Sequence, residues 1–453
     1  MKRTLEWVTE RMGAPSEREF VSKATDITGW SIDTRTLAPG DLFFAIRGPN
    51  HDGHAHAAQA VERGAVGVVA DRSIDVSGPV FHVPDVLQAM QSLASDARRE
   101  WNGEVIGITG SAGKTTTKDI VAALLADSIP TTKTEGNFNN HIGLPLSLLR
   151  IPETAQSAVL EMGMNKAGEI RELAEISGPQ IGVVTNVGWA HIEAFESIEG
   201  IAAAKQELID SLGPKGCAVL NADDSRVSRF AEKHPGKTLR YGFASAADVR
   251  ATDVQYERDR TTFRCGTTSF ETALTGRHNV SNILAGIAVA GLHGIPPESL
   301  VDAVRHLHSG KMRGERIESR GILIYNDCYN SNPDAAKAML DVLRDTPARR
   351  RFAVLGEMLE LGHWAELLHR DVGDYAARGG VDVLVGIRGA ASFMLDAAKR
   401  AGLRADAAFF FEDPDDAGRL VRTLAQEGDA VLFKGSRGVR VERALQQFVG
   451  AVN

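Results

Sequence analysis

One glycine-rich segment, TGSAGKTTT at residues 109–117, constrains the fold of this 453-residue chain more than any other stretch. It follows the apolar run VIGIT at residues 105–109, where a buried strand is expected to turn into a helix. Such a turn directs backbone N–H groups and the helix N-terminus at one point, which suits phosphate oxygens. The chain therefore requires an α/β unit with a phosphate-binding loop.

The side chains of this loop have separate expected roles. Lys114 places a positive charge at the β- and γ-phosphates, and Thr115 offers its hydroxyl to Mg²⁺. The spacing departs from the usual pattern, since Ile108 stands where the first glycine belongs. An incidental glycine turn is a weak alternative, because strand, glycines, lysine and hydroxyls coincide. The residues expected at the nucleotide are Gly110, Ser111, Ala112, Gly113, Lys114, Thr115 and Thr116.

Strand-like and helix-like segments alternate on both sides of a break near residue 312. Apolar runs occur at 105–109, 157–162, 181–186 and 217–222, and again at 322–327, 352–356, 381–386, 407–411 and 430–435. Such runs between helices are typical of parallel sheets covered on both faces. We predict an α/β protein of three domains. Residues 1–102 form a small mixed α/β domain with few, short helices, 103–312 a central P-loop parallel-sheet ATPase domain, and 313–453 a C-terminal Rossmann-like domain.

Charge and hydropathy exclude several classes of partner. The formal net charge of −8 argues against a mainly electrostatic grip on nucleic acid or on an anionic membrane. No apolar run approaches the roughly 20 residues that span a bilayer. The N-terminus starts with basic residues but lacks the apolar region of a signal peptide. We expect a cytoplasmic protein without a nucleic-acid partner and without membrane insertion.

Candidate metal ligands follow the loop within the central domain. Glu161 ends the apolar run at 157–161, and a carboxylate at the carboxyl end of a strand faces the crevice where α/β sheets bind ligands. His191 follows the next run at a polar position. With Thr115 these residues give oxygen and imidazole donors suited to Mg²⁺ or Mn²⁺. Lys205 lies in a helix-like segment, where a solvated surface lysine is the default interpretation.

Several motifs together resemble one enzyme family. They are TGSAGKTT at 109–116, EMG at 161–163, the segment 186–191, GRHNVSN at 276–282 and KGS at 434–436. In this order and spacing they are similar to the Mur ligases of peptidoglycan synthesis, over essentially the whole chain. The resemblance implies three mobile domains that close around ATP and a UDP-sugar peptide.

Other segments narrow the resemblance to one branch of the family. Residues 31–48 and the HDGH at 51–54 are similar to the UDP-sugar-binding domain of the ligases that add the third residue or the final dipeptide. The Asp-Asn-Pro-Arg motif usual for the third residue is absent. The segments 134–145, 326–333 and 355–362 instead resemble the branch that joins D-alanyl-D-alanine to UDP-N-acetylmuramoyl-tripeptide. Diaminopimelate and lysine both remain open as the third residue of that tripeptide.

The resemblance also assigns site residues. A lysine at the position of Lys205 is carbamylated in the family and holds a second metal ion. The expected metal ligands are Thr115, Glu161, His191 and Lys205, and the expected catalytic residues are Lys114, Lys205, His191 and Glu161. ATP contacts are expected from His278, Asn279, Asn282, Arg313 and Asp327. Substrate contacts are expected from Ser31, Asp33, Arg35, Asn137, Asn139, Asn140, Tyr329, Asn330, Asn332 and Glu360, the last four at the dipeptide.

The implied reaction passes the γ-phosphoryl group of ATP to the terminal carboxylate of the tripeptide. The amine of the dipeptide then attacks the acyl phosphate, and two Mg²⁺ ions, or Mn²⁺, assist by neutralising phosphate charge. We expect this enzyme to act as a monomer.

Three alternative functions outside the ligases could each be recognised by a specific motif, activity or residue set. A GTPase needs Asn-Lys-x-Asp, and the near match at 165–168 has Gly168 in the last position. An ATPase motor would hydrolyse ATP briskly without any peptide. A metal-binding module could use His51, His54 and His56. Within the ligases, the enzyme that adds the third amino acid is the second choice.

Overall fold

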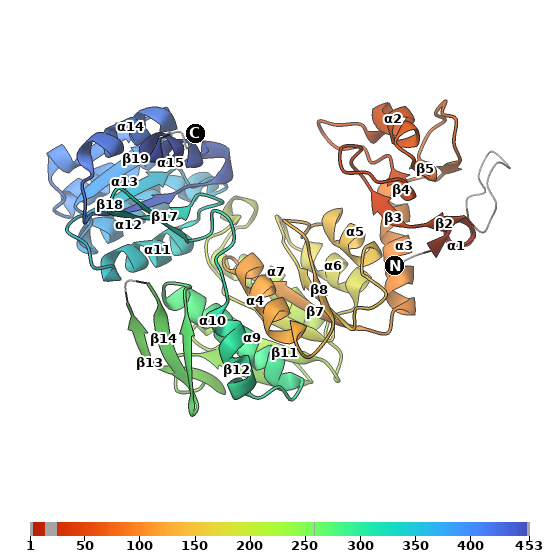
Figure 1. Cartoon of the computed structure of the whole chain (residues 1–453), viewed down its shortest axis with the longest axis horizontal. Coiled ribbons are helices and arrows are strands. Elements are labelled where there is room, and N and C mark those ends of the chain that lie inside the picture. Colours follow the sequence, from red (N-terminus) through yellow and green to blue (C-terminus); the bar gives the residue numbers. More distant parts are fainter. Residues whose placement is uncertain (1–2, 14–24, 258, 451–453) are drawn as a thin grey trace.

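The computed structural model describes residues 3–13, 25–257 and 259–450, and the predicted domain ends at residues 1 and 453 lie outside them. Figure 1 shows three sheet-based units, with the N-terminal unit beside α5 and α6 of the central unit and the C-terminal unit on the other side. The α/β class with a central parallel sheet is confirmed. Within the described residues, no helix is both long enough and apolar enough to cross a bilayer.

The N-terminal unit is built on a parallel sheet in the order β3-β4-β5-β6. Its elements are β1 (Arg3–Thr4), α1 (Leu5–Met12), β2 (Asp26–Ile27), β3 (Gly29–Ser31), β4 (Asp41–Phe44), η1 (Gly53–His56), α2 (Ala57–Glu62), β5 (Gly67–Ala70), β6 (Val80–His82) and α3 (Val86–Glu100). The expectation of only short helices is wrong for α3, which has 15 residues. Asp85 caps it, and Met90, Leu93 and Ala97 recur at helical spacing on its buried face.

The central unit holds a nine-stranded sheet in the order β15-β14-β13-β12-β11-β10-β7-β9-β8. Its strands are β7 (Glu104–Thr109), β8 (Thr131–Lys133), β9 (Ser157–Glu161), β10 (Ile181–Val184), β11 (Cys217–Asn221), β12 (Lys237–Gly242), β13 (Val249–Tyr256), β14 (Thr261–Cys265) and β15 (Thr268–Thr272). Its helices are α4 (Lys114–Ala126), α5 (Gly143–Leu149), α6 (Glu169–Ser177), η2 (Ile192–Ala194), α7 (Ile198–Asp210), α8 (Ser225–Arg229), η3 (Phe230–Glu232), α9 (Arg277–Leu292), η4 (Pro297–Leu300) and α10 (Val301–Arg305).

One edge of this sheet is antiparallel, which the strand and helix alternation did not predict. Strands β13, β14 and β15 pair antiparallel, whereas the strands from β8 to β12 are parallel. Their residues alternate between buried and exposed, as in Phe263 followed by Arg264. Phe263 and Phe270 stack on the inner face with ring centroids 5.2 Å apart. This alternation is the signal of a half-exposed antiparallel strand.

The C-terminal unit has a six-stranded sheet in the order β16-β17-β21-β18-β19-β20, in which only β16 among the described strands is antiparallel to its neighbour. Its strands are β16 (Glu315–Ser319), β17 (Ile322–Asp327), β18 (Arg351–Gly356), β19 (Val383–Ile387), β20 (Ala408–Phe411) and β21 (Ala430–Lys434). Its helices are α11 (Pro333–Asp345), η5 (Gly362–Trp364), α12 (Ala365–Arg378), α13 (Ala391–Arg400), η6 (Ala405–Ala407), α14 (Pro414–Leu424), η7 (Arg437–Val439) and α15 (Glu442–Val449). The loops that follow β17 and β18 reach the central unit.

Candidate functional site

The glycine-rich loop joins β7 to α4 as predicted, and two of its glycines are required by geometry. Gly113 has φ 81° directly before α4, in the left-handed region that glycine adopts without strain. A Cβ atom on Gly110 would lie 1.8 Å from Oγ1 of Thr185. The first N–H groups of a helix have no acceptor within it, so the start of α4 can donate to phosphate oxygens.

The segment that follows β10 braces the loop. Asn186 accepts the N–H of Ala112 at 2.8 Å, and the Thr185 hydroxyl donates to the Ala112 carbonyl at 2.7 Å. The Ser111 hydroxyl donates to the carbonyl of Gly188 at 3.0 Å and accepts its N–H at 2.8 Å. None of the three bracing residues after β10 was predicted at the site, although Asn186 and Gly188 stand in a quoted motif. These hydrogen bonds fix the shape of the loop.

Lys114 is half-buried and donates from Nζ to the carbonyl of Gly110 at 2.8 Å. Burial lowers the pKa of this lysine, the positive charge of Arg313 lowers it further, and the carboxylate of Glu161 opposes both. Arg313 comes from the start of the C-terminal unit, where its guanidinium lies 3.8 Å from the ring centroid of Tyr329. The structure thus brings Lys114, Glu161 and Arg313 close enough for their charges to interact.

Glu161 connects the loop to a predicted substrate residue. It ends β9 and is buried, and its Oε2 accepts from the Thr115 hydroxyl at 2.8 Å. Its Oε1 accepts from Nδ2 of Asn139 at 2.8 Å. Two hard oxygen donors side by side at a phosphate loop fit Mg²⁺.

His191 lies against a carboxylate of the C-terminal unit. Its Nδ1 lies 2.6 Å from Oε2 of Glu360 in the C-terminal unit. The imidazole lowers the pKa of that carboxyl. Both residues have a left-handed backbone, with φ 61° at His191 and φ 63° at Glu360. The structure therefore joins Thr115 and Glu161 directly and brings His191 together with a residue predicted at the dipeptide.

Lys205 corrects one interpretation of the sequence. It lies on α7 as predicted, but only 1% of it is exposed, so the default of a solvated surface lysine is wrong. Burial lowers its pKa well below the usual value, and the positive charge of Lys114 acts in the same direction. A buried lysine of low pKa is neutral for part of the time and can react as an amine.

The alternative of a metal module built on histidines finds no support in the N-terminal unit. The described residues contain no group of three or more His, Cys, Asp or Glu side chains arranged to hold a metal ion. His54 is buried between two carboxylates, with Nδ1 2.7 Å from Asp52 and Nε2 3.1 Å from Asp71. His51 and His56 do not join this pair.

Three predicted ATP-contact residues, His278, Asn279 and Asn282, lie on α9, and Asn282 contacts the loop region. Asn282 accepts the Thr117 hydroxyl at 3.1 Å, and a Cβ on Gly113 would lie 2.9 Å from Oδ1 of Asn282. Asn279 donates to the carbonyl of Thr275 at 2.8 Å. Burial lowers the pKa of His278, which the nearby charge of Asp327 opposes. Of the two asparagines, Asn282 contacts the start of α4, and Asn279 lies beside Asn282.

The carboxyl edge of the C-terminal sheet adds a second polar group. Asp327 at the end of β17 is hydrogen-bonded to Lys434 at the end of β21, a buried lysine that was quoted in a motif but not assigned to the site. Lys434 also donates to the carbonyl of Asn330 at 3.0 Å. Asn332 caps α11 by accepting from Ala335, and it donates to the carbonyl of Ser111 across the interface at 3.4 Å.

The predicted uridine-diphosphate residues form a separate cluster. Ser31 is buried at the end of β3, and its hydroxyl accepts the N–H of Asp33 at 3.2 Å. Asp33 and the exposed Arg35 form a two-point ion pair with Nε–Oδ1 2.9 Å and Nη2–Oδ2 2.6 Å, which lowers the pKa of Asp33 to about 2. In the loop before α5, Asn140 accepts from Gly143 at 2.9 Å, and Asn137 is exposed. The structure does not bring the β3 cluster to the phosphate loop.

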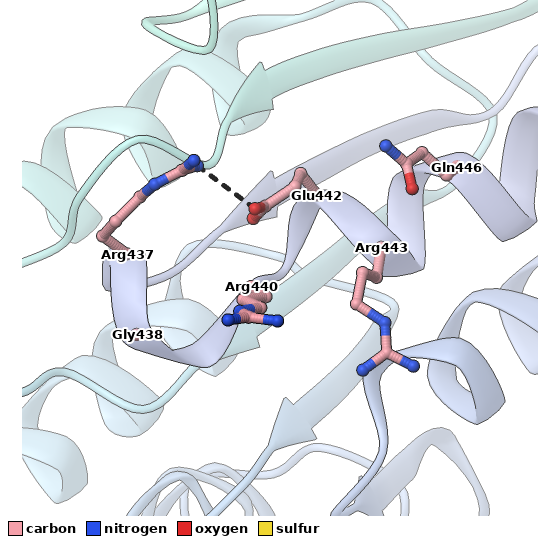
Figure 2. Close-up of a pocket in the computed structure, with 6 residues that line it drawn as sticks. All are labelled: Arg437, Gly438, Arg440, Glu442, Arg443 and Gln446. Atoms are coloured by element: carbon pink, nitrogen blue, oxygen red, sulfur yellow. Dashed lines mark hydrogen bonds and ion pairs between the residues drawn. The ribbon is translucent and has the colours of Figure 1, made fainter. Parts of the chain in front are cut away.

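A cavity of about 560 Å³ lies at the start of α15, and none of the predicted residues lines it. Figure 2 shows three arginines there, with Arg437 paired to Glu442 at 3.1 Å. Arg443 is paired with Asp415. Since acidic partners already hold two of the three guanidinium groups, this cavity is left out of the site.

Comparisons with known proteins match the chain along its length. Three family models fit it: "Mur ligase family, catalytic domain" at residues 26–113, "Mur ligase middle domain" at 108–290 and "Mur ligase, glutamate ligase domain" at 312–437. A relative from Bacillus subtilis, named UDP-N-acetylmuramoyl-tripeptide--D-alanyl-D-alanine ligase, is 35% identical over 99% of each chain.

Solved structures give the same result. MurF from Acinetobacter baumannii superposes with a TM-score of 0.90 at 28% identity, covering 99% of each chain. MurF ligase from Thermotoga maritima in complex with ADP superposes with a TM-score of 0.83 at 29% identity, covering 93% of this chain and 97% of that one.

Proposed function

From the premise that this chain belongs to the Mur ligase family, we propose that it joins D-alanyl-D-alanine to UDP-N-acetylmuramoyl-tripeptide at the expense of ATP. The product is the UDP-linked pentapeptide used in peptidoglycan synthesis. The similarity runs end to end with relatives that carry this name, which favours it over the ligase for the third amino acid and over an ATPase without ligation.

One observation of the structure carries the proposal: Thr115, Glu161 and Asn139 are hydrogen-bonded in a row. The row leads from the start of the phosphate-loop helix to the segment that we assign to the nucleotide-sugar peptide. A γ-phosphate bound at the loop would then lie next to an acceptor carboxylate bound at that segment, which supports the proposal. Adjacent reactants and fixed charges are what a phosphoryl transfer requires from a protein.

In the first step, a carboxylate oxygen of the tripeptide attacks the γ-phosphorus, the bond to the bridging oxygen breaks, and ADP leaves. The dipeptide amine then attacks the acyl carbon, loses a proton to solvent, and the tetrahedral intermediate expels phosphate. Lys114 and Arg313 hold phosphate oxygens, and the closed domains exclude water from the acyl phosphate.

Thr115, Glu161, His191 and Lys205 would hold divalent cations in this scheme. Thr115 and Glu161 fit the preference of Mg²⁺ for oxygen ligands. The neutral amine of Lys205 would gain a carboxylate by adding to the carbon of CO₂ and releasing one proton. Bound cations would neutralise charge on the phosphates during transfer.

We assign the remaining contacts by domain. Residues 1–102 bind the uridine-diphosphate side through Ser31, Asp33 and Arg35, and residues 103–312 bind ATP, with His278, Asn279 and Asn282 near adenine. Residues 313–453 close over ATP with Arg313 and Asp327 and bind the dipeptide near Tyr329, Asn330, Asn332 and Glu360. We propose that the enzyme acts as a monomer in the cytoplasm.

A phosphate-release assay tests the function. The purified protein is given ATP, UDP-N-acetylmuramoyl-tripeptide with either diaminopimelate or lysine, and D-alanyl-D-alanine, or single amino acids in its place. We expect phosphate and pentapeptide only with the dipeptide. Activity only with a free diamino acid and the UDP-dipeptide would show the ligase for the third residue, and ATP hydrolysis that needs no peptide would show an ATPase.

A further inference from the structure

One segment of the central unit, residues 186–194, contacts both the phosphate loop and the C-terminal unit, and we call it the docking strip. Toward the central unit it braces the phosphate loop through Asn186 and Gly188. Toward the C-terminal unit it receives α11 and the loop before α12, with Trp189 and Trp364 packed at 5.5 Å between ring centroids. The docking strip therefore links the C-terminal unit to the phosphate loop.

The N-terminus of α11 fits the strip closely. Asp334 accepts the backbone N–H of Trp189 at 2.8 Å. A Cβ atom on Gly188 would lie only 2.1 Å from Oδ2 of Asp334, so the docked position leaves no room for a side chain there. Asn332 on the same helix turn reaches the carbonyl of Ser111 in the loop itself.

The second contact reaches the expected metal-binding imidazole. Glu360 lies 2.6 Å from Nδ1 of His191, and its backbone carbonyl accepts the N–H of Glu193 at 3.1 Å. The surroundings hold both residues in left-handed conformations, which cost free energy for a residue with a side chain. A carboxylate at one imidazole nitrogen fixes the ring and leaves the other nitrogen available to a metal ion.

We propose that Asp334 and Glu360 are positioning residues that act across the domain interface: closure on the docking strip sets the phosphate loop through Gly188 and Trp189, and orients the His191 imidazole. The proposal rests on the proposed function, because it concerns the same nucleotide and metal site. It gives Glu360 a role through His191 in addition to the dipeptide contact proposed above.

A double-mutant cycle tests the Asp334 contact. Gly188→Ala and Asp334→Ala each break the same contact, so each should lower kcat by roughly 10- to 100-fold, as small displacements of reacting groups do, with little change in KM for the UDP-tripeptide. The kcat of the double variant should be no lower than that of the less active single variant, because the contact can be lost only once. Losses that multiply would overturn the proposal.

Two control variants separate docking from folding. Asp334→Asn keeps an oxygen acceptor for Trp189 and should keep most of the activity. If Asp334→Asn lost as much activity as Asp334→Ala, this result would count against the proposal. Gly213→Ala adds a Cβ where no atom lies within 4 Å and should behave as the wild type. Thermal unfolding shows that each variant is folded before its kinetics are compared.

Manganese affinity tests the Glu360 contact without using activity. With a non-hydrolysable ATP analogue bound, Glu360→Gln should weaken Mn²⁺ binding roughly 10- to 100-fold in a paramagnetic resonance titration, the usual loss when the partner of a metal-bound histidine is removed. Glu366→Gln, which removes an exposed ion pair with Arg370 on α12, is the matched control. Unchanged affinity in Glu360→Gln would overturn the positioning role. The titration needs no ligation, so it is separable from failure of the proposed function.

Discussion

The two outer units join the central unit in different ways. At the N-terminal junction, α3 packs on α5 and α6, with Leu93 and Ala97 fully buried and Arg98 donating to the carbonyls of Ser177 and Gly178 at 2.7 and 3.2 Å. At the C-terminal junction, a half-buried tryptophan pair accompanies polar contacts such as that of Asp334 with Trp189. The first junction resembles the inside of a domain, and the second resembles a docking surface.

The difference suggests how such a ligase can hold one substrate in a fixed position and still open to admit the others. Apolar burial holds the N-terminal unit, so a substrate bound there, as we propose, would have a fixed position relative to the phosphate loop. Polar contacts and a half-buried tryptophan pair hold the C-terminal unit, and an interface of this kind can open and close. Perturbing each junction should therefore give different kinds of loss.

The largest effect is expected between the junctions, at the phosphate loop. Lys114→Ala removes the charge that faces the β- and γ-phosphates, so ligation should fall by roughly 10³-fold or more. Phosphate release measured with all three substrates checks this, and thermal unfolding should show an intact fold. Activity close to that of the wild type would contradict the placement of ATP at this loop.

A loss nearly as large is expected at Lys205. Lys205→Ala removes the group that would carry the carbamate, so turnover should fall by roughly 10²- to 10³-fold. Added bicarbonate or short carboxylic acids should restore part of it, because a free carboxylate can occupy the vacated space. Wild-type turnover in this variant would refute the carbamate.

The N-terminal junction should respond mainly in stability. Leu93→Ala opens a cavity beneath α3 and should lower the free energy of unfolding by about 2–5 kcal/mol. Denaturant unfolding measures this loss. Small-angle scattering of the folded variant should match that of the wild type. A weaker contraction on binding an ATP analogue, as expected for a loosened C-terminal unit, would contradict the difference between the junctions.

The C-terminal junction should respond mainly in closure. Trp364→Ala removes one ring of a half-buried pair, and the pair contributes about 1 kcal/mol, so overall stability changes little. The contraction on binding an ATP analogue, followed by small-angle scattering, should become weaker. A loss of stability as large as that of Leu93→Ala would show that both junctions are built alike.

The smallest effect concerns acid stability in the N-terminal cluster. Arg35 lowers the pKa of Asp33 from 3.8 to about 2, so the folded state binds fewer protons than the unfolded chain between these values. The stabilisation from this pair is therefore present above about pH 4 and is lost as pH falls toward 2. Unfolding of the wild type and Asp33→Ala should differ by a small constant amount above pH 4 and converge near pH 2. A difference that grows below pH 4 would contradict the ion pair.

The sequence predicted the parts of the fold that depend on local pattern. The loop at 109–117, the parallel strands on each side and the carboxylate at the end of β9 follow from apolar runs and glycines. The length of α3 and the antiparallel β13–β15 edge were missed, although the helical spacing of apolar residues in α3 and the alternation in β14 are present in the sequence. The recognised motifs supplied the family, which the spacing of the loop alone could not.

The burial and pairing of several site residues depend on tertiary contacts, which the sequence patterns did not predict. Lys205 is buried by elements distant in sequence, so its helix position alone suggested a surface residue. Glu360 faces His191 only because two units dock, and Lys434 joins Asp327 only because β21 inserts beside β17. Pairings of this kind depend on topology, which local patterns do not encode.

An isotope-transfer experiment tests the central claim, amide formation through an acyl phosphate, most directly. UDP-N-acetylmuramoyl-tripeptide labelled with ¹⁸O in its terminal carboxylate is incubated with ATP, D-alanyl-D-alanine and the enzyme, and the released phosphate is analysed by mass spectrometry. The account predicts one labelled oxygen in each phosphate, because the carboxylate oxygen that attacks phosphorus leaves with it. Pentapeptide formation with unlabelled phosphate would contradict it.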